Sequence, residues 1–289
     1  LGRQPCHHPA GYGDHRGISG AGVHPYAATA LLSVCLARDL IPNKQSEYKR
    51  VGSIISDARL AGLIDWLSIE DRTRALRSNP HWTTPESIIQ SAADGYAIDK
   101  WASQPCRIEV WIEKDALTGV IEPACSELDV AYFACRGYTS QSEQWRAGKR
   151  FEAYRHEGQE IIILHFGDHD PSGLDMTRDN QDRLDLFSYH AVRVRRLALN
   201  MDQIEEYNPP PNPVKLTDSR VNAYMARFGS DSWELDALEP TVINRLIREA
   251  VAECLDRDAW DAALAREQEQ RDLLHAASER WDELTEILK

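Results

Sequence analysis

The pattern of hydrophobic and polar positions changes several times along the chain. Residues 1–25 show neither the period of a strand nor that of a helix, and they hold six Gly, three Pro and four His. Such a segment cannot bury enough apolar surface to offset the entropy of ordering it. We therefore expect residues 1–25 to form a disordered or atypical tail.

Residues 26–78 predict a compact helical unit. One helix is expected over about 27–39, and a second over about 45–61, where apolar positions repeat with a helical period. The β-rich segments 63–66 and 69–72 are expected to be short strands. Two helices followed by a β-ribbon is the outline of a winged helix-turn-helix, a DNA-binding unit.

Asn79-Pro80 interrupts this pattern, and Thr84-Pro85 is a good N-cap and first-turn pair. A helix is expected from there to about Trp101, so residues 79–105 are predicted to be a linker helix between two domains.

From Cys106 the pattern alternates between strands and helices. The run Glu160–Phe166 is nearly continuously apolar, which is typical of a central parallel strand. Strands are expected near 107–112, 130–135, 160–166 and 192–199, with helices near 115–128, 140–156 and 173–187 between them. Residues 106–240 therefore predict an α/β domain with a mainly parallel sheet, followed by acidic helices over 241–289.

Charge is unevenly distributed within the net value of −13. Residues 1–77 carry 10 Lys and Arg against 7 Asp and Glu, whereas the remainder carries 23 against 39. Phosphate contacts are therefore expected in the first third of the chain. The candidate DNA-binding residues lie on or beside the second helix: Lys44, Lys49, Arg50 and Arg59. A solvated helix face is the alternative interpretation of the same four residues.

No basic segment followed by an apolar stretch opens the chain, and its longest nearly apolar run, 26–37, is too short to span a bilayer. We expect a soluble cytoplasmic protein with no membrane partner, and association with the nucleoid would suit a DNA-binding role.

Acidic side chains follow two of the expected strands. Glu113 comes after the first strand, and Asp168 and Asp170 come after the central one. Because ligands of open α/β sheets bind at the carboxyl ends of the strands, these three acids are candidates for one oxygen-rich site for Mg²⁺ or Mn²⁺. The alternative is that the two aspartates only cap the next helix and form its first turn.

This arrangement of Glu113 and Asp168-His169-Asp170 resembles the Toprim domain, which topoisomerases, primases and OLD-family nucleases share. With a winged-helix unit before it, the chain resembles the A subunit of topoisomerase VI and its small bacterial and phage relatives. The matching segments are Tyr48–Val51, Ser56–Arg59, Glu70–Arg74, Gly167–Gly173 and Trp233–Leu238.

The resemblance implies catalytic and metal-binding roles for Glu113, Asp168 and Asp170, with Mg²⁺ or Mn²⁺ as cofactor and Glu113 also as general acid or base. Asp236 or Glu234 would complete the metal site.

Three neighbours of these acids are also candidates. Lys114 and Arg136 are expected phosphate contacts, with surface roles as the alternative. His169 is expected to face away from the metal.

One feature of the resembled family is missing. Its tyrosine nucleophile would fall near Leu32-Ser33, where no tyrosine occurs. Tyr26 lies more than a helical turn upstream, and Tyr48 lies on the next helix. Either the tyrosine-dependent reaction is lost, or another residue performs it, or the N-terminal sequence is not the natural one, and we expect no covalent tyrosyl–DNA adduct.

The leading hypothesis is a Mg²⁺-dependent, DNA-binding Toprim protein that acts on the phosphodiester backbone, as a nuclease or by topoisomerase-like cleavage. DNA is the expected partner, and a homodimer would suit a family that works on two strands. The alternative is a non-catalytic DNA-binding or assembly module of phage or bacterial origin. A nucleotide-binding enzyme is disfavoured because neither a P-loop nor a G-x-G-x-x-G fingerprint occurs.

Overall fold

The fold is known from a computed structural model. The described residues are 26–27, 45–66, 69–70, 79–189 and 192–287. The chain divides into two compact units, which are described separately. Of the described residues, one unit comprises 26–27, 45–66, 69–70, 101–189 and 192–257, and the other comprises 79–100 and 258–287.

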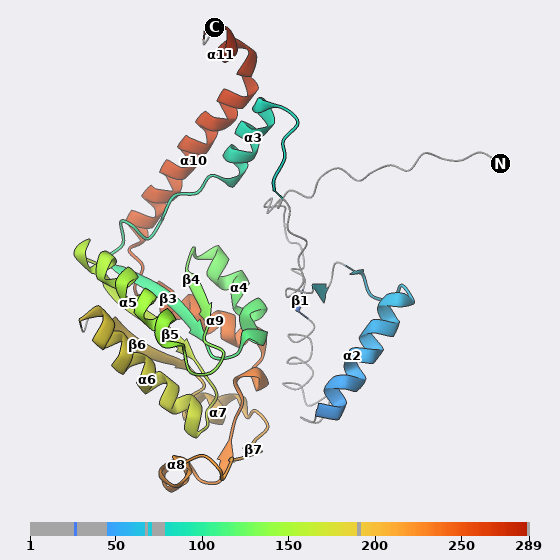
Figure 1. The fold of residues 1–289 in the computed structure, drawn as a ribbon, viewed down its shortest axis with the longest axis vertical. Helices are drawn as coiled ribbons and strands as arrows, with labels where there is room; N and C mark the ends of the chain where they lie inside the picture. Colours follow the sequence, from blue (N-terminus) through green and yellow to red (C-terminus); the bar gives the residue numbers. More distant parts are fainter. Residues whose placement is uncertain (1–25, 28–44, 67–68, 71–78, 190–191, 288–289) are drawn as a thin grey trace, which may run out of the picture. The chain divides into compact units, whose positions relative to one another are not determined.

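A parallel sheet of four strands forms the centre of the first unit (Figure 1). The strands are β3 (Cys106–Ile112), β4 (Ala131–Ala134), β5 (Glu160–Phe166) and β6 (Val192–Ala198). They lie in the order β4-β3-β5-β6, and all three pairings are parallel. Every residue of β5 after Glu160 is buried, as its apolar run predicts. The α/β class with a parallel sheet is therefore confirmed.

The two faces of the sheet are covered by different helix pairs (Figure 1). On one face, α5 (Gln141–His156) and α6 (Pro171–Ser188) enclose a core around Phe151, Ile161 and Ile163. On the other face, α4 (Thr118–Glu127) packs against α9 (Pro240–Ala252). Helices can pack against both faces because successive side chains of each strand point to opposite faces of the sheet.

An extension follows β6 and returns the chain to the end of the sheet. It contains α7 (Met201–Tyr207), β7 (Asn212–Pro213), α8 (Val221–Phe228), β8 (Asp231–Ser232) and the 3-10 helix η3 (Leu235–Ala237). β7 and β8 pair antiparallel, and Trp233 then pairs with His169 through backbone hydrogen bonds of 2.8 and 3.0 Å. The extension therefore brings residues 234–236 next to the segment that follows β5.

The expected winged helix is described only in part. The second expected helix is confirmed as α2 (Gln45–Leu60), whereas the first lies almost entirely outside the described residues. β2 (Ile69–Glu70) pairs in parallel with β1 (Tyr26–Ala27). The strand expected over 63–66 is wrong.

Arg59 supplies the physical reason for this correction. Its guanidinium donates to the Trp66 carbonyl at 2.7 Å and lies over the indole ring, 4.4 Å from its centroid. These contacts fold the segment back onto the end of α2, and the backbone turns at residues 61–64.

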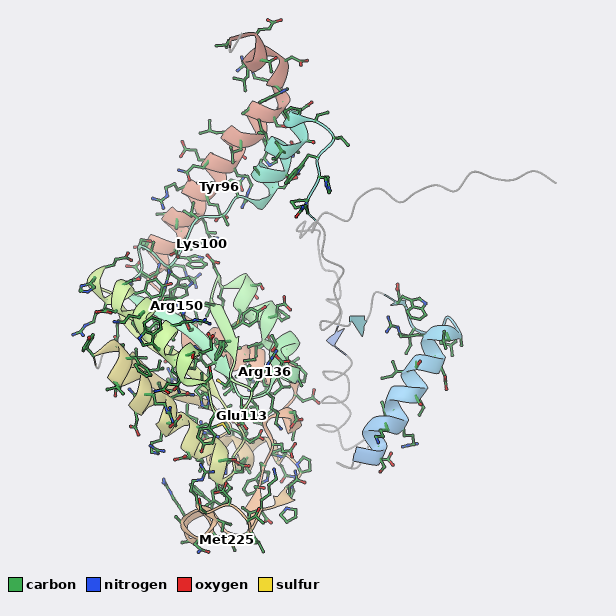
Figure 2. All side chains as sticks on the ribbon, in the orientation of Figure 1. Tyr96, Lys100, Glu113, Arg136, Arg150 and Met225 are labelled. Atoms are coloured by element: carbon green, nitrogen blue, oxygen red, sulfur yellow. The ribbon has the colours of Figure 1, made fainter. Side chains whose placement is uncertain are left out.

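The second unit pairs α3 (Pro85–Gly95) with the long α10 (Arg257–Glu279), which is followed by α11 (Trp281–Ile287). Thr84 forms the expected N-cap of α3. The helix ends at Gly95 and not at Trp101, because the Ile98 amide donates to the Glu267 carboxylate at 2.9 Å. Tyr96 also donates to Gln270 at 2.5 Å, and Figure 2 shows Tyr96 and Lys100 beside α10.

No helix among the described residues is both long and apolar enough to cross a lipid bilayer.

Candidate functional site

The carboxyl ends of β3 and β5 bring two of the expected acids together. Ile112 and Phe166 are register partners, so Glu113 and the segment beginning at Gly167 leave the sheet side by side. Glu113 accepts a hydrogen bond from the Asp168 amide at 2.9 Å through Oε2. Figure 2 labels Glu113 at this edge of the sheet. The expected adjacency of the two strand ends is thus confirmed.

Glu113 lies in a confined position. A Cβ at Gly167 would come within 3.1 Å of its Oε2, so any larger residue there would require the carboxylate to shift by a few tenths of an ångström. Burial raises the pKa of Glu113 above its ordinary value, the Asp168 amide opposes this shift, and Asp170 adds to it.

Asp168 is buried at the same edge, with 8% of its surface exposed. Its Oδ1 accepts from the Leu235 amide at 2.8 Å, which fixes the side chain against η3. Burial raises the pKa of Asp168 to about 7; Lys114 opposes this shift and Glu113 adds to it. The carboxyl of Asp168 therefore titrates near neutrality when no cation is added.

Lys114 lies among three carboxylates. Its Nζ is 2.9 Å from Asp236 Oδ1 and 3.2 Å from both Asp168 Oδ1 and Glu234 Oε2. Burial alone would lower the pKa of Lys114, but the carboxylates of Asp168, Asp236 and Glu234 raise it above its ordinary value. The expected phosphate contact is in this structure the counter-ion of the acidic cluster.

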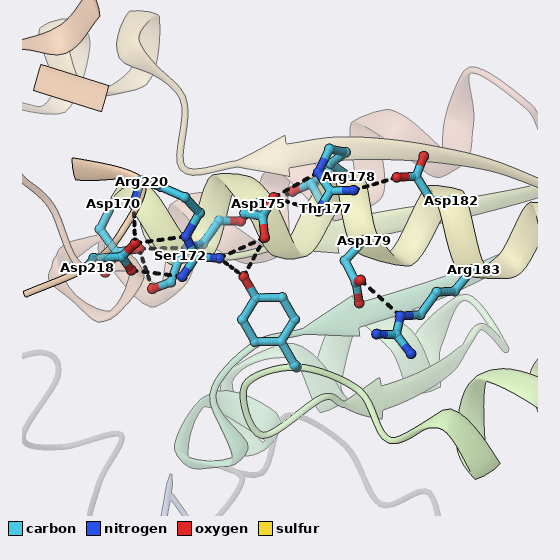
Figure 3. Close-up of polar contacts among 12 residues, drawn as sticks. Asp170, Ser172, Asp175, Thr177, Arg178, Asp179, Asp182, Arg183, Asp218 and Arg220 are labelled. Carbon is cyan, nitrogen blue, oxygen red and sulfur yellow. Dashed lines mark hydrogen bonds and ion pairs between the residues drawn. The ribbon is translucent and has the colours of Figure 1, made fainter. Parts of the chain in front are cut away.

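Asp170 has a different role from Asp168. It is the N-cap of α6, where its Oδ1 accepts from the Gly173 amide at 2.6 Å and from the Ser172 hydroxyl at 2.9 Å (Figure 3). The capping alternative therefore describes Asp170. A Cβ at Gly173 would lie 2.2 Å from the Asp168 carbonyl oxygen, so this turn requires glycine.

Arg196 is a residue of the site that the sequence patterns did not single out. It lies on β6, and its guanidinium donates to the carbonyls of Asp168 at 2.6 Å, Gly167 at 2.9 Å and Gly173 at 2.9 Å. These bonds hold the chain between the end of β5 and the start of α6. The basic interruptions of β6 were the only signal in the sequence.

His169 is buried between the two aspartates, and its side chain lies in an aromatic cluster. Its Nδ1 is 2.9 Å from the Tyr224 hydroxyl, and its ring also contacts Phe228 and Trp233. Burial lowers the pKa of His169 to about 4, so the imidazole is neutral at physiological pH. These contacts give the side chain a packing role.

A second polar network lies beside the first turns of α6 (Figure 3). Arg220 pairs with Asp175 at 2.7 Å and with Asp218 at 2.8 Å, and Tyr138 donates to Asp175 at 2.6 Å. Burial, followed by the hydrogen bond to Asp175, raises the pKa of Tyr138 to about 12, so its hydroxyl stays protonated.

Arg136, another expected phosphate contact, pairs with Asp115 at 3.1 Å.

The expected DNA-binding residues are only partly described. Lys49 and Arg50 are exposed on α2, and Arg50 pairs with Glu47 at 2.7 Å. Arg59 is engaged with Trp66. Lys44 lies outside the described residues, and so does the 32–33 position of the expected nucleophile.

The donor chemistry of the site suits a hard divalent cation, because the acids offer only oxygen ligands. In the described conformation, however, Asp170 caps α6 and Lys114 pairs with Asp168 and Asp236. Among the described residues, no group of three or more His, Cys, Asp or Glu side chains is arranged around one metal position. The acids thus fit Mg²⁺ by ligand type, and at least one side chain must move for them to converge.

Comparison of the chain with models of protein families, with curated proteins and with solved structures gave no match.

Proposed function

We propose that this chain is a Mg²⁺-dependent, DNA-binding protein of the Toprim type that acts on the phosphodiester backbone without a tyrosine nucleophile. The observation that supports this best is the contact between Glu113 and the Asp168 amide at adjoining strand ends. The excess of carboxylates over cations around Lys114 adds to it.

The proposal assigns Asp168 and Asp236 as the residues that hold Mg²⁺, with Glu113 and Asp170 beside them. The ion would neutralise charge on the phosphate and lower the pKa of a bound water. Glu113, whose pKa burial raises above its ordinary value, is proposed as the general acid or base. Arg196 and the Leu235 amide keep Asp168 in place.

Plasmid cleavage and relaxation in Mg²⁺, Mn²⁺ or EDTA test the proposed reaction. The variant Asp168→Asn keeps an oxygen that can accept from the Leu235 amide but removes the charge, so metal-dependent cleavage should be lost. Asp179→Asn is a matched control because Asp179 is an aspartate of α6 whose side chain is equally little exposed and also pairs with a basic side chain, that of Arg183 at 2.9 Å. Equal cleavage by wild type and Asp168→Asn would contradict the proposal.

DNA is proposed to bind through α2, with a homodimer placing two such helices on one duplex. Each phosphate contact should contribute a slope of about 0.9 in log affinity against log salt. The double variant Lys49→Glu/Arg50→Glu should therefore lose affinity and have a shallower salt slope. The matched control Arg146→Glu/Lys149→Glu changes two exposed cations of α5 and should leave binding unchanged.

A hydrolytic reaction leaves no protein attached to DNA. Incubation with labelled DNA followed by denaturation should therefore give no labelled protein band. A labelled band that disappeared in Tyr26→Phe would show that a tyrosine attacks the phosphate.

The alternative function is a non-catalytic DNA-binding or assembly module. The pairing of Lys114 with Asp168 and Asp236 favours it, because these acids are already neutralised in part. DNA binding that depends on α2, without cleavage under any metal condition, would be its signature.

A further inference from the structure

Lys114 is a cation held where a metal ion would have to bind. One ammonium pairs with three carboxylates that come from the end of β5 and from the extension, more than fifty residues away along the chain. Its side chain is 25% exposed, so a path from the cluster to solvent exists.

We infer that Lys114 is the resident counter-ion of this cluster, that a divalent metal ion displaces its ammonium, and that the released ammonium pairs with a phosphate of the bound nucleic acid. This inference rests on the proposed metal site and specifies how that site is filled.

Two positive ions cannot share these oxygens. Mg²⁺ binds carboxylate oxygens at about 2.0–2.1 Å, and the ammonium is 2.9 Å from Asp236 Oδ1 and 3.2 Å from Asp168 Oδ1. A metal on the same oxygens would lie within a few ångströms of Nζ, where like charges repel strongly in a poorly solvated site. Binding of the metal and pairing of Lys114 are therefore competing events.

The lysine side chain suits this exchange. It is a compact charge on a flexible stem, and Lys114 follows Glu113 directly at the end of β3. Rotation of the stem can move the ammonium out of the cluster while the backbone stays in the sheet. A phosphate bound beside the metal would then meet a positive charge that the free protein had kept paired.

The change in metal affinity on removing Lys114 should have a different sign for a competing lysine than for a purely structural one. If Lys114 competes with the metal, its removal should tighten metal binding. If it only supports the fold, its removal should weaken metal binding or leave it unchanged. Cleavage should fall in either case, so metal affinity and not activity separates the two roles.

The wild-type protein allows a direct test by lysine acylation and mass spectrometry. Mg²⁺ at concentrations that saturate the site should increase acylation of Lys114 several-fold, because its ammonium leaves the carboxylates. Lys149, which pairs with Glu152 at 2.9 Å and is 45% exposed, is the internal reference and should not change. Unchanged acylation of Lys114, although calorimetry shows Mg²⁺ binding, would overturn the inference and leave the proposed metal site standing.

Calorimetric titration with Mn²⁺ gives a second test. Lys114→Met should bind Mn²⁺ roughly tenfold more tightly than wild type, which corresponds to about 1.4 kcal/mol. Lys114→Arg, which keeps the charge, should bind Mn²⁺ no more tightly than wild type does. The control Lys149→Met should bind Mn²⁺ with the affinity of wild type. Equal or weaker binding by Lys114→Met would overturn the inference, whereas no binding by wild type would overturn the proposed function with it.

Discussion

Two lysines, Lys100 and Lys114, are buried beside carboxylates. At the Lys100 site the cations outnumber the carboxylates, whereas at the Lys114 site the carboxylates outnumber the cations. Lys100, in the second unit, is 2.8 Å from Glu267, which also accepts from Arg271 at 2.9 Å. Two cations and the backbone amide of Ile98 thus interact with the single carboxylate of Glu267. Lys114, in the first unit, is the one described cation that pairs with Asp168, Glu234 and Asp236.

The pKa values follow this difference. Burial alone would raise the pKa of Glu267, but its donors, Lys100 first, lower it below the ordinary value. Asp168 also has little exposed surface but is enclosed by more of the protein, and its pKa is raised to about 7 because one shared ammonium does not offset this deeper burial and the neighbouring acids. A closed ion pair thus stabilises the fold, whereas we propose that a cluster with too few cations retains affinity for another cation.

The largest expected effect is on metal binding. Asp168→Asn should weaken Mn²⁺ binding by roughly a hundredfold or more, since a charged oxygen of the proposed metal site is lost. Glu267→Gln should leave Mn²⁺ binding unchanged. Calorimetric titration of both variants with Mn²⁺ tests this difference between the two lysine sites. A loss of Mn²⁺ affinity in Glu267→Gln as well would contradict it.

The next effect is on stability, and it should differ in sign between the two places. Glu267→Gln leaves Lys100 and Arg271 without their anion and should cost about 2–4 kcal/mol of unfolding free energy. Asp168→Asn in EDTA relieves like-charge repulsion and should be neutral or stabilising. Urea unfolding measures both, and a large loss for Asp168→Asn would show that its charge supports the fold.

The pH dependence should also differ in sign. For Asp168 the folded pKa is above the ordinary 3.8, so its contribution is fully present below about pH 4 and is lost as pH rises through about 7. In EDTA, the unfolding free energy of Asp168→Asn should therefore rise relative to that of wild type as the pH increases from 5 to 8. For Glu267 the folded pKa is lowered, so its contribution is present above 4.5 and is lost as pH falls. Urea unfolding from about pH 3 to 8 would contradict the prediction if the stabilities of the two variants relative to wild type changed in parallel.

The smallest expected effect is that of deleting residues 1–24. Their Gly, Pro and His content cannot bury much apolar area, so the melting temperature should stay nearly unchanged. A drop of many degrees would show that this segment is packed.

The sequence predicted the parts of the fold that depend on local patterns. The apolar run of β5 gave its bounds, and the capping residue Thr84 marked the start of α3. The helix α7 was missed because its seven residues are too few for a clear period.

Only the part of the site that lies directly at the strand ends could be predicted from the sequence. Glu113 and Asp168 follow adjacent strands, so their meeting could be expected. The pairing of Lys114 with Asp236 joins residues 122 positions apart and depends on the path of the whole extension. The same limit hid the pairing of α3 with α10, which depends on contacts such as that between Tyr96 and Gln270.

Gly173 has a consequence for the sequence variation that this protein can tolerate. Because a Cβ there would lie 2.2 Å from a backbone oxygen that Arg196 also holds, no rotamer choice can relieve the collision. A saturation library at position 173 should return glycine alone, even when the library is selected only for folding. A homologue that had lost its acids but kept the fold would then still carry this glycine as a trace of its ancestry.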